Sequence, residues 1–150
     1  MSNQIARNTA SQYSSSKANR YFCQTQSTAN GSSETVIWDD TTSDYLSSEL
    51  SYLNGDFTIQ KSGVYMISLT IVFAPNATGF RQIYVEKDGE SDRKGCMLIL
   101  ANTVGDTCLT TTWVGQLEKN DIIKAKVVQT SGGALDIESG TSSFNIASMK

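Results

Sequence analysis

Residues 63–73 read GVYMISLTIVF, and this stretch decides the fold class. Most of its residues are β-branched or aromatic, types that favour strands. Taken at alternate positions, one face of the strand carries large apolar side chains, namely Tyr65, Ile67, Leu69, Ile71 and Phe73. The other face carries small and mid-sized side chains, namely Val64, Met66, Ser68, Thr70 and Val72. Because neither face holds a charge, we expect a strand over 64–73 that is covered on both sides.

From residue 20 onward the chain continues with the same alternation, interrupted by Gly, Asn, Asp and Ser. We predict further strands at 81–87, 96–101, 107–117, 122–129 and 143–148, and shorter ones at 35–38 and 45–50. Residues 45–53 alternatively fit a short helix. Many short strands separated by turn residues are typical of an antiparallel β-sandwich. The fold class is therefore expected to be all-β.

The alternation also predicts which side chains fill the core. Those expected to point inward are Phe57, Tyr65, Ile67, Leu69, Ile83, Val85, Trp113, Ile123, Val127, Phe144 and Ile146. A chain of this length can bury most of its apolar surface without metal ions or disulfides.

The chain has 150 residues, 39% hydrophobic and 18% charged, which is typical of one globular domain. Residues 1–19 are polar and lack periodicity, so we expect a flexible lead-in or linker there and the folded domain over 20–150. The first residues lack the apolar core of a signal peptide, and no run of about eighteen apolar residues could span a membrane. We expect no membrane insertion.

Composition also limits the chemistry. There is no histidine, which excludes Ser-His-Asp and Cys-His catalytic arrangements and histidine metal sites. The cysteines Cys23, Cys96 and Cys108 have neither disulfide-type nor metal-type spacing, so we expect free thiols and no cofactor. A net charge of −3 without a basic cluster argues against nucleic acid as a partner. We expect a protein that binds and is not an enzyme; a carboxylate-based hydrolase is the less favoured alternative.

The densest acidic cluster consists of Asp39, Asp40 and Asp44. Several carboxylates close together can hold a calcium ion, which prefers hard oxygen ligands. A solvated loop between two short strands is the simpler interpretation, and the sequence leaves the choice open.

Four segments, taken in order, resemble the superfamily of complement 1q and tumour necrosis factor. Residues 57–67 are similar to its aromatic residue followed by Gly-x-Tyr, 79–89 to a strand ending in a Lys-Asn-Gly turn, 117–127 to leucine, Gly-Asp and alternating valines, and 143–146 to the closing strand. Ile67 replaces an aromatic residue, Asp88 an asparagine and Asn120 a glycine, and a collagen-like Gly-x-y stem is absent. The resemblance implies a ten-strand jelly roll, a compact homotrimer, and recognition through loops and outer faces.

In that family the strands corresponding to 64–73 and 107–117 pack around a threefold axis. Their uncharged sides predict a trimer interface formed by Val64, Met66, Ser68, Thr70, Thr110, Thr112 and Val114. An exposed Thr-rich sheet is the alternative. Tyr84 and Tyr52 are expected to point outward, where exposed aromatic rings can contact a ligand.

The favoured function is a trimeric recognition or receptor-binding head at the tip of a viral or phage fibre, or of another extracellular stem. Its ligand would be a cell-surface protein or glycan. The alternatives are a secreted complement-1q-like ligand-binding module and a purely structural trimerisation cap. The expected location is extracellular or on a virion surface.

Overall fold

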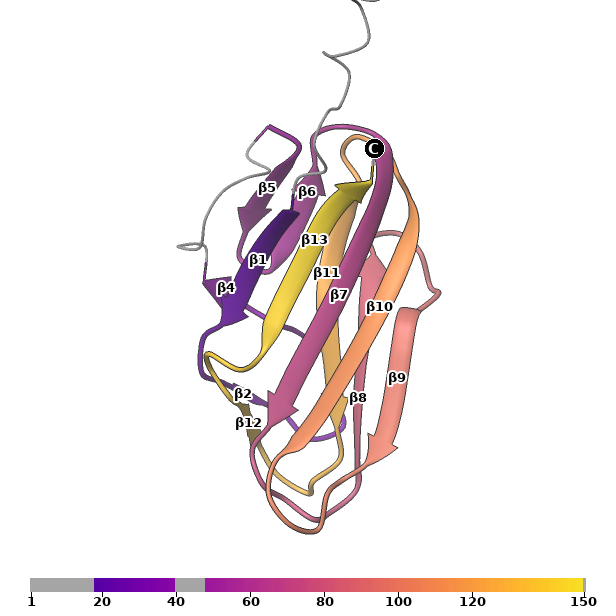
Figure 1. Cartoon of the computed structure of the whole chain (residues 1–150). Helices are drawn as coiled ribbons and strands as arrows, with labels where there is room; N and C mark the ends of the chain where they lie inside the picture. Colours follow the sequence, from indigo (N-terminus) through magenta and orange to yellow (C-terminus); the bar gives the residue numbers. More distant parts are fainter. Residues whose placement is uncertain (1–17, 40–47, 150) are drawn as a thin grey trace, which may run out of the picture.

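The computed structural model describes residues 18–39 and 48–149, which form two packed antiparallel sheets (Figure 1). The strands of the first sheet, in spatial order, are β4 (Trp38–Asp39), β1 (Ala18–Cys23), β13 (Ser143–Met149), β7 (Gly63–Phe73) and β10 (Thr107–Leu117). Those of the second are β5 (Leu50–Leu53), β6 (Asp56–Ile59), β11 (Ile122–Gln129), β8 (Phe80–Lys87) and β9 (Lys94–Leu100). Three shorter strands extend these sheets: β2 (Gln26–Thr28) pairs β12 (Leu135–Ile137), β12 pairs β7, and β3 (Glu34–Thr35) pairs β11.

The chain passes back and forth between the two sheets. It goes from β6 in the second sheet to β7 in the first, to β8 and β9 in the second, to β10 in the first and to β11 in the second, before closing with β13 in the first. The five main strands of each sheet together form a jelly roll, to which the three shorter strands are added. The all-β expectation is therefore confirmed. Within the described residues there is no helix long and apolar enough to cross a lipid bilayer.

The core lies between the sheets and is built from the inward positions of both. Phe57 stacks on Phe144 with ring centroids 4.3 Å apart, and Tyr21 meets Phe57 edge-on at 5.0 Å. The expected core residues found buried here are Phe57, Tyr65, Ile67, Leu69, Ile83, Val85, Ile123, Val127, Phe144 and Ile146.

Trp113 differs from this expectation because it is only half-buried. It lies on β10, an edge strand of the first sheet, where the second sheet does not cover it completely. The ammonium of Lys94 lies 5.5 Å from its ring, and a Cβ at Gly115 would come within 2.6 Å of two ring atoms. Glycine at 115 therefore makes room for the indole.

Several strand limits also differ from the sequence expectation. β1 begins at Ala18, so Ala18 and Asn19 belong to the sheet and not to a lead-in; Asn19 is buried and donates to the Tyr21 hydroxyl. The expected strand at 35–38 is two short strands, β3 and β4, in different sheets. Residues 50–53 form β5, which excludes the helix alternative there. Of the expected strand at 45–50, residues 45–47 lie outside the described residues, residues 48 and 49 form a turn, and only Leu50 belongs to a strand.

Candidate functional site: an uncharged sheet face

The outward side of the first sheet carries an unbroken set of uncharged side chains on three neighbouring strands. We call this surface the uncharged face. It consists of Val64, Met66, Ser68, Thr70 and Val72 on β7, Cys108, Thr110, Thr112, Val114 and Gln116 on β10, and Asn145, Ala147 and Met149 on β13. All seven residues expected at a trimer interface lie on it.

Strand register brings these residues into rows. Thr112 is opposite Ser68 on one side of β7, and Asn145 is opposite Ser68 on the other. Val114, Met66 and Ala147 form the next row. The polar rows of Ser68 and Thr70 are adjacent, and apolar rows that contain Met66 and Val72 lie on either side of them. The last row is mixed, because Gln116 is opposite Val64.

The hydroxyl groups of the polar rows bond to one another. The Oγ1 atoms of Thr70 and Thr110 lie 3.0 Å apart, and Thr112 Oγ1 donates weakly to Ser68 Oγ at 3.5 Å. A hydroxyl that is already hydrogen-bonded costs less free energy to remove from water than one that is not. These rows can therefore be covered by another protein surface.

The apolar rows are not covered by the rest of the chain. Val114 is 54% exposed and Met149 is 47% exposed, and Val64 and Met66 are exposed as well. On the inward side of β7, Tyr65, Ile67 and Leu69 are fully buried. The expectation that β7 is covered on both sides therefore fails within one chain, since the sandwich supplies a cover for one side only.

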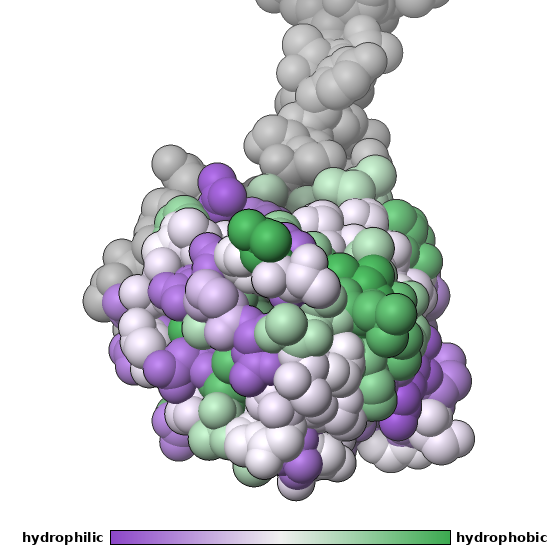
Figure 2. Space-filling view, turned by 90° about the horizontal axis from the view of Figure 1, so that it is seen from below, coloured by the Kyte–Doolittle hydropathy of each residue, from purple (hydrophilic) through white to green (hydrophobic). Residues whose placement is uncertain are grey.

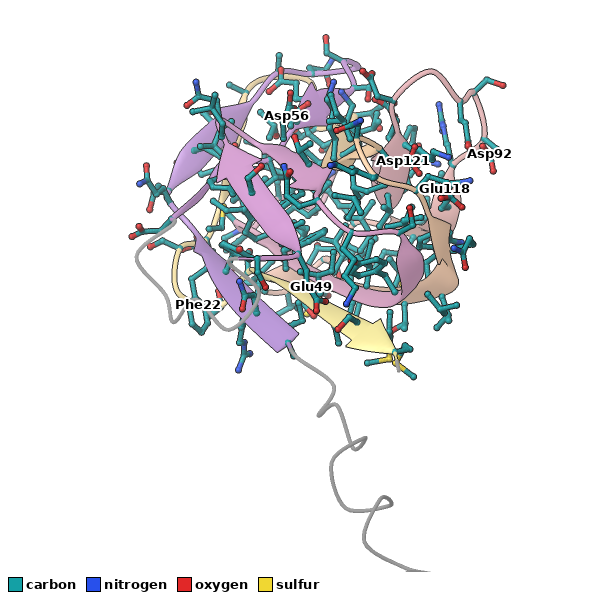
Figure 3. The ribbon with its side chains drawn as sticks, turned by 90° about the horizontal axis from the view of Figure 1, so that it is seen from above. Phe22, Glu49, Asp56, Asp92, Glu118 and Asp121 are labelled. Carbon is teal, nitrogen blue, oxygen red and sulfur yellow. The ribbon has the colours of Figure 1, made fainter. Side chains whose placement is uncertain are left out.

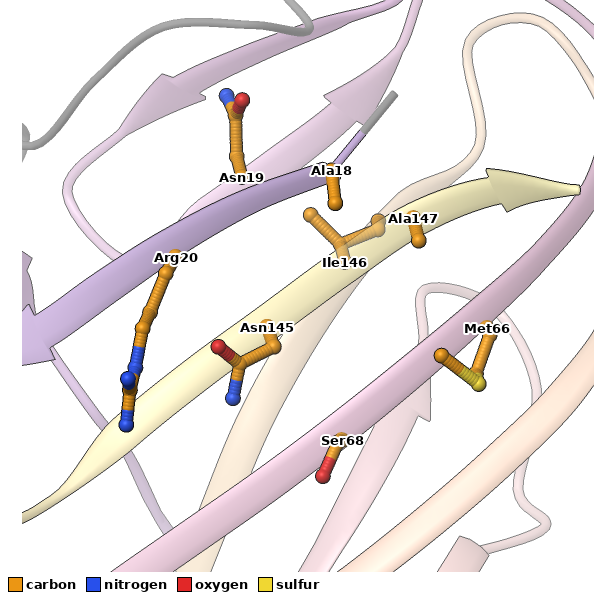
Figure 4. A pocket seen from close by; sticks show the side chains of 8 residues that line it. All are labelled: Ala18, Asn19, Arg20, Met66, Ser68, Asn145, Ile146 and Ala147. Carbon is orange, nitrogen blue, oxygen red and sulfur yellow. The ribbon is translucent and has the colours of Figure 1, made fainter. Parts of the chain in front are cut away.

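A shallow hollow of about 240 Å³ lies where β1, β13 and β7 meet (Figure 4). Arg20, Asn145 and Ser68 extend from these three strands along one row, and Met66 and Ala147 form the neighbouring apolar part. Arg20 borders the uncharged face on β1, and its guanidinium lies 4.9 Å from the ring centroid of Phe22.

A second hollow, of about 290 Å³, lies beside the start of β7 and the end of β13. This end of the sandwich is at the top of Figure 1, and we call it the upper end. Glu49, Lys61, Tyr65 and Ser148 contribute to its wall, and Glu49 Oε1 is 3.9 Å from the ammonium of Lys61. Burial, and then the charge of Glu49, raise the pKa of Tyr65. Neither of these two hollows contains the pair of carboxylates that glycoside-type hydrolysis requires.

The outward side of the second sheet has a different character because its charges are paired. Lys124 Nζ lies 3.4 Å from Asp88 and 3.8 Å from Asp56, and Lys126 Nζ lies 3.9 Å from Glu86. Acidic side chains also gather around the upper end, among them Asp56, Asp92, Glu118 and Asp121 (Figure 3). We call the surface formed by Asp56, Glu86, Asp88, Lys124 and Lys126 the ion-paired face.

At the upper end the ion pairs are shorter. Lys87 lies 3.0 Å from both Glu90 and Asp121, and Lys94 binds Glu90 at 2.6 Å. The hydrogen bond from Lys94, followed by that from Lys87, lowers the pKa of Glu90 to about 2. Reciprocally, Glu90 raises the pKa of Lys94.

The two tyrosines expected to point outward do not present free rings. Tyr84 is only 4% exposed, because the Arg93 guanidinium lies 4.8 Å from its ring centroid and its hydroxyl bonds Ser33 Oγ at 2.7 Å. Tyr52 is half-buried and packs on Phe57, and its hydroxyl accepts from the Trp38 backbone N–H at 2.7 Å. The prediction of exposed aromatic contacts was wrong for both residues.

The cysteines are all free thiols. Cys23 is buried, which raises its pKa to about 11, whereas Cys96 and Cys108 are exposed. Of the acidic cluster considered for calcium, Asp40 and Asp44 lie outside the described residues, and Asp39 ends β4. No group of three metal-ligating side chains occurs among residues 18–39 and 48–149.

Comparison with known proteins identifies the fold. No protein-family model matches the chain, and no curated protein sequence matches it significantly. Among solved structures it is similar to murine APRIL at pH 5.0, with a TM-score of 0.68 and 13% identity over 90% of this chain and 100% of that one. The fold is a tumour necrosis factor-like jelly roll. A structure of Eiger TNF from S. frugiperda is similar too, with a TM-score of 0.64 and 10% identity over 90% of this chain and 93% of that one.

The resemblance inferred from residues 57–67 and the three later segments is therefore confirmed at the level of fold. Identities of 13% and 10% carry the fold alone, so the function rests on the surfaces of this chain.

Proposed function

We propose that this chain is a homotrimeric recognition head, displayed at the tip of a viral or phage fibre or of another extracellular stem. The observation that carries the proposal is the uncharged face. A sheet face directed at water normally carries charged side chains, as the ion-paired face does. A face of hydroxyl and apolar rows is instead suited to burial against other copies of the chain.

The energetics favour such burial. Removing an unpaired charge from water costs several kcal/mol, and the uncharged face has no charge to remove. Its paired hydroxyls cost little, and its exposed valine and methionine side chains gain about 25 cal/mol for each Å² of apolar surface covered. Small residues such as Ala147 and Ser68 permit close approach of neighbouring sheets.

A threefold ring needs a second surface on each copy, because its contacts are heterologous. We assign this role to the edge formed by β9 and β10. Met97 on β9 and Val104 in the loop after it are both exposed. Apolar groups on the edge of one copy would then contact the uncharged face of the next.

Display at a tip is supported by the positions of the start of β1 and the end of β13. β1 begins and β13 ends at the upper end of the sandwich (Figure 1). The loops that follow β7, β9 and β11 gather at the opposite end. A stem attached at the upper end would leave these lower loops and the outward side of the second sheet free for a cell-surface ligand.

The proposal is tested by placing like charges on the uncharged face. We expect the wild type to have the mass of three chains in light scattering at micromolar concentration. Met66→Glu combined with Thr112→Glu should give monomers, because each copy would bring two uncompensated carboxylates into the interface. The matched control is Thr58→Glu combined with Val128→Glu, which adds the same charge to the outward side of the second sheet and should remain trimeric.

A monomeric wild type would refute the trimer. A double variant at positions 66 and 112 that stays trimeric would place the interface elsewhere. Circular dichroism on each variant separates a change of assembly from a failure to fold.

A further inference from the structure

Among the residues that the structure describes, one cation on the outward side of the second sheet lacks a carboxylate partner. Lys87, Lys94, Lys124 and Lys126 each pair with at least one carboxylate. Arg93, which precedes β9, pairs with none among the described residues. Arginine is nevertheless the side chain best suited to hold a carboxylate, because its planar guanidinium can donate two parallel hydrogen bonds.

Arg93 is exposed, but two side chains of β8 hold its guanidinium in place. Its Nη1 donates to Gln82 Oε1 at 2.8 Å, and its guanidinium lies over the buried ring of Tyr84. Tyr84 is itself held by the hydrogen bond to Ser33. A guanidinium oriented in this way loses little conformational entropy when it binds.

Next to Arg93 lies an exposed apolar strip on β9. Cys96, Leu98 and Leu100 occupy alternate positions and so share one side of the strand; we call them the β9 strip. Leu98 is 53% exposed and Leu100 is 79% exposed. Leu100 is paired with the half-buried Phe80, and Leu98 with Gln82.

The side-chain amide of Gln82 connects the Arg93 guanidinium with the β9 strip. Gln82 accepts from Arg93 through Oε1 and donates to Cys96 Sγ through Nε2 at 3.1 Å. An apolar patch also lies over the side of the molecule where β9 runs, the right-hand side in Figure 2. Exposed leucines on an edge strand beside an unpaired guanidinium are typical of a surface that contacts another protein.

We propose that Arg93 and the β9 strip form a docking site for a partner protein, and that the partner contributes an Asp or Glu carboxylate flanked by a large apolar side chain. Arg93 binds the carboxylate, and Leu98 and Leu100 pack on the apolar neighbour. A sugar is a poorer fit, because the strip offers aliphatic side chains where sugar hydroxyls need hydrogen-bonding partners. The inference deepens the proposed recognition function by naming the partner chemistry.

The test uses a random linear peptide library displayed on phage and selected on the purified full chain. We expect selected peptides to carry Asp or Glu within two positions of Leu, Ile or Phe. Arg93→Gln should weaken binding of the synthetic peptides about tenfold or more, the effect of one charge-assisted hydrogen bond. Leu98→Ser should weaken it to a similar degree.

Matched controls remove the same groups elsewhere. Lys119→Gln removes an exposed cation at the upper end, and Leu53→Ser removes an exposed leucine on β5; both should leave the affinity unchanged. Replacing Asp by Asn, or Glu by Gln, in the peptide should reproduce the loss caused by Arg93→Gln. Titration with sialyllactose tests an acidic sugar as the source of the carboxylate.

Failure to select any peptide, peptides without acids, or binding indifferent to Arg93→Gln would each overturn the site. Sialyllactose binding that depends on Arg93 would overturn the assignment to a protein partner. The outcome is independent of assembly, because peptide binding is also measured on the monomeric Met66→Glu, Thr112→Glu variant. A wild type that is monomeric and still binds the peptides would count against the proposed trimer alone.

Discussion

The two outward faces of this sandwich have nearly the same backbone but opposite chemistry. On the second sheet, Lys124 and Lys126 alternate with Glu86 and Asp88, and the charges compensate one another in contact with water. On the first sheet, Thr112 and Val114 are opposite Ser68 and Met66, and the outward positions of β7 and β10 carry no charge. Both patterns suit a β-strand equally well.

The contrast teaches that strand formation and the surroundings of a strand are separate questions. Alternation is satisfied by either set of side chains, since it depends only on which residues point into the core. The side chains that point away from the core are free to vary. They therefore report what lies outside the chain, which is water over the ion-paired face and, in our proposal, other copies over the uncharged face.

The largest expected effect compares the two sides of β7. Tyr65→Ala should lower the free energy of unfolding by about 3–5 kcal/mol at any protein concentration, because Tyr65 fills the core. Met66→Ala, one residue later, should destabilise only through assembly, so that its effect depends on protein concentration. Thermal and denaturant unfolding at several concentrations measures both.

If Tyr65→Ala left the melting temperature unchanged, the inward side of β7 would be misassigned. If the effect of Met66→Ala were the same at every concentration, the outward side would not be part of an interface.

The next effect is a difference in thiol reactivity between the faces. Cys96 lies on the outward side of the second sheet and should react fast with iodoacetamide at neutral pH. Cys108 lies on the uncharged face and should react slowly in the trimer but fast in the monomeric Met66→Glu, Thr112→Glu variant. Cys23 should stay unmodified in both, because burial raises its pKa to about 11 and leaves little thiolate.

Mass spectrometry of peptides after timed alkylation gives the three rates. Equal rates for Cys108 in the trimer and the monomer would show that the lower part of β10 lies outside the interface. A peptide linking Cys96 to Cys108 would contradict the free thiols altogether.

The smallest effect concerns the ion pairs at the upper end. The pKa of Glu90 is lowered from 4.5 to about 2, so its stabilising contribution is present above pH 4.5 and is lost as the pH falls from about 4.5 through 2. The melting temperature of Glu90→Gln should lie slightly below that of the wild type at neutral pH. The difference should close as the pH approaches 2.

High salt at neutral pH should reduce the same difference, because exposed ion pairs are screened. Gln116→Asn, on the uncharged face, is the control and should show no such pH dependence. A gap between Glu90→Gln and wild type that persists at pH 2 would mean that the ion pairs do not cause it.

The sequence by itself determined which segments form the main strands. The limits of β10 at 107–117 and of β11 at 122–129 agree with the alternation read from the chain. The sequence also determined the backbone conformation of at least one turn. Asn120 stands where the resembled family has glycine, and its backbone φ of 75° is in the left-handed region that glycine and asparagine tolerate best.

Short strands were not encoded in the same way. β2 and β12 have three residues each and pair mainly with one another at the lower end of β7. Three residues are too few to show a period of two, and the pairing joins segments about a hundred residues apart. The sequence signal was therefore absent, although Leu135 and Ile137 are both buried.

Only the tertiary structure decided what covers each outward side chain. Tyr84 has an outward position on β8, yet Arg93 from the connection to β9 and Ser33 from a part of the chain far away in sequence bury it. Arg81 shares the inward side of β8 with Ile83 and Val85, and the partners that let a charged residue be buried there are the backbone carbonyls of Asn76, Thr78 and Phe80, which accept from its guanidinium. Periodicity assigns a residue to one side of its own strand. It carries no information about the loops and sheets that later pack against that side, because those contacts depend on the whole chain.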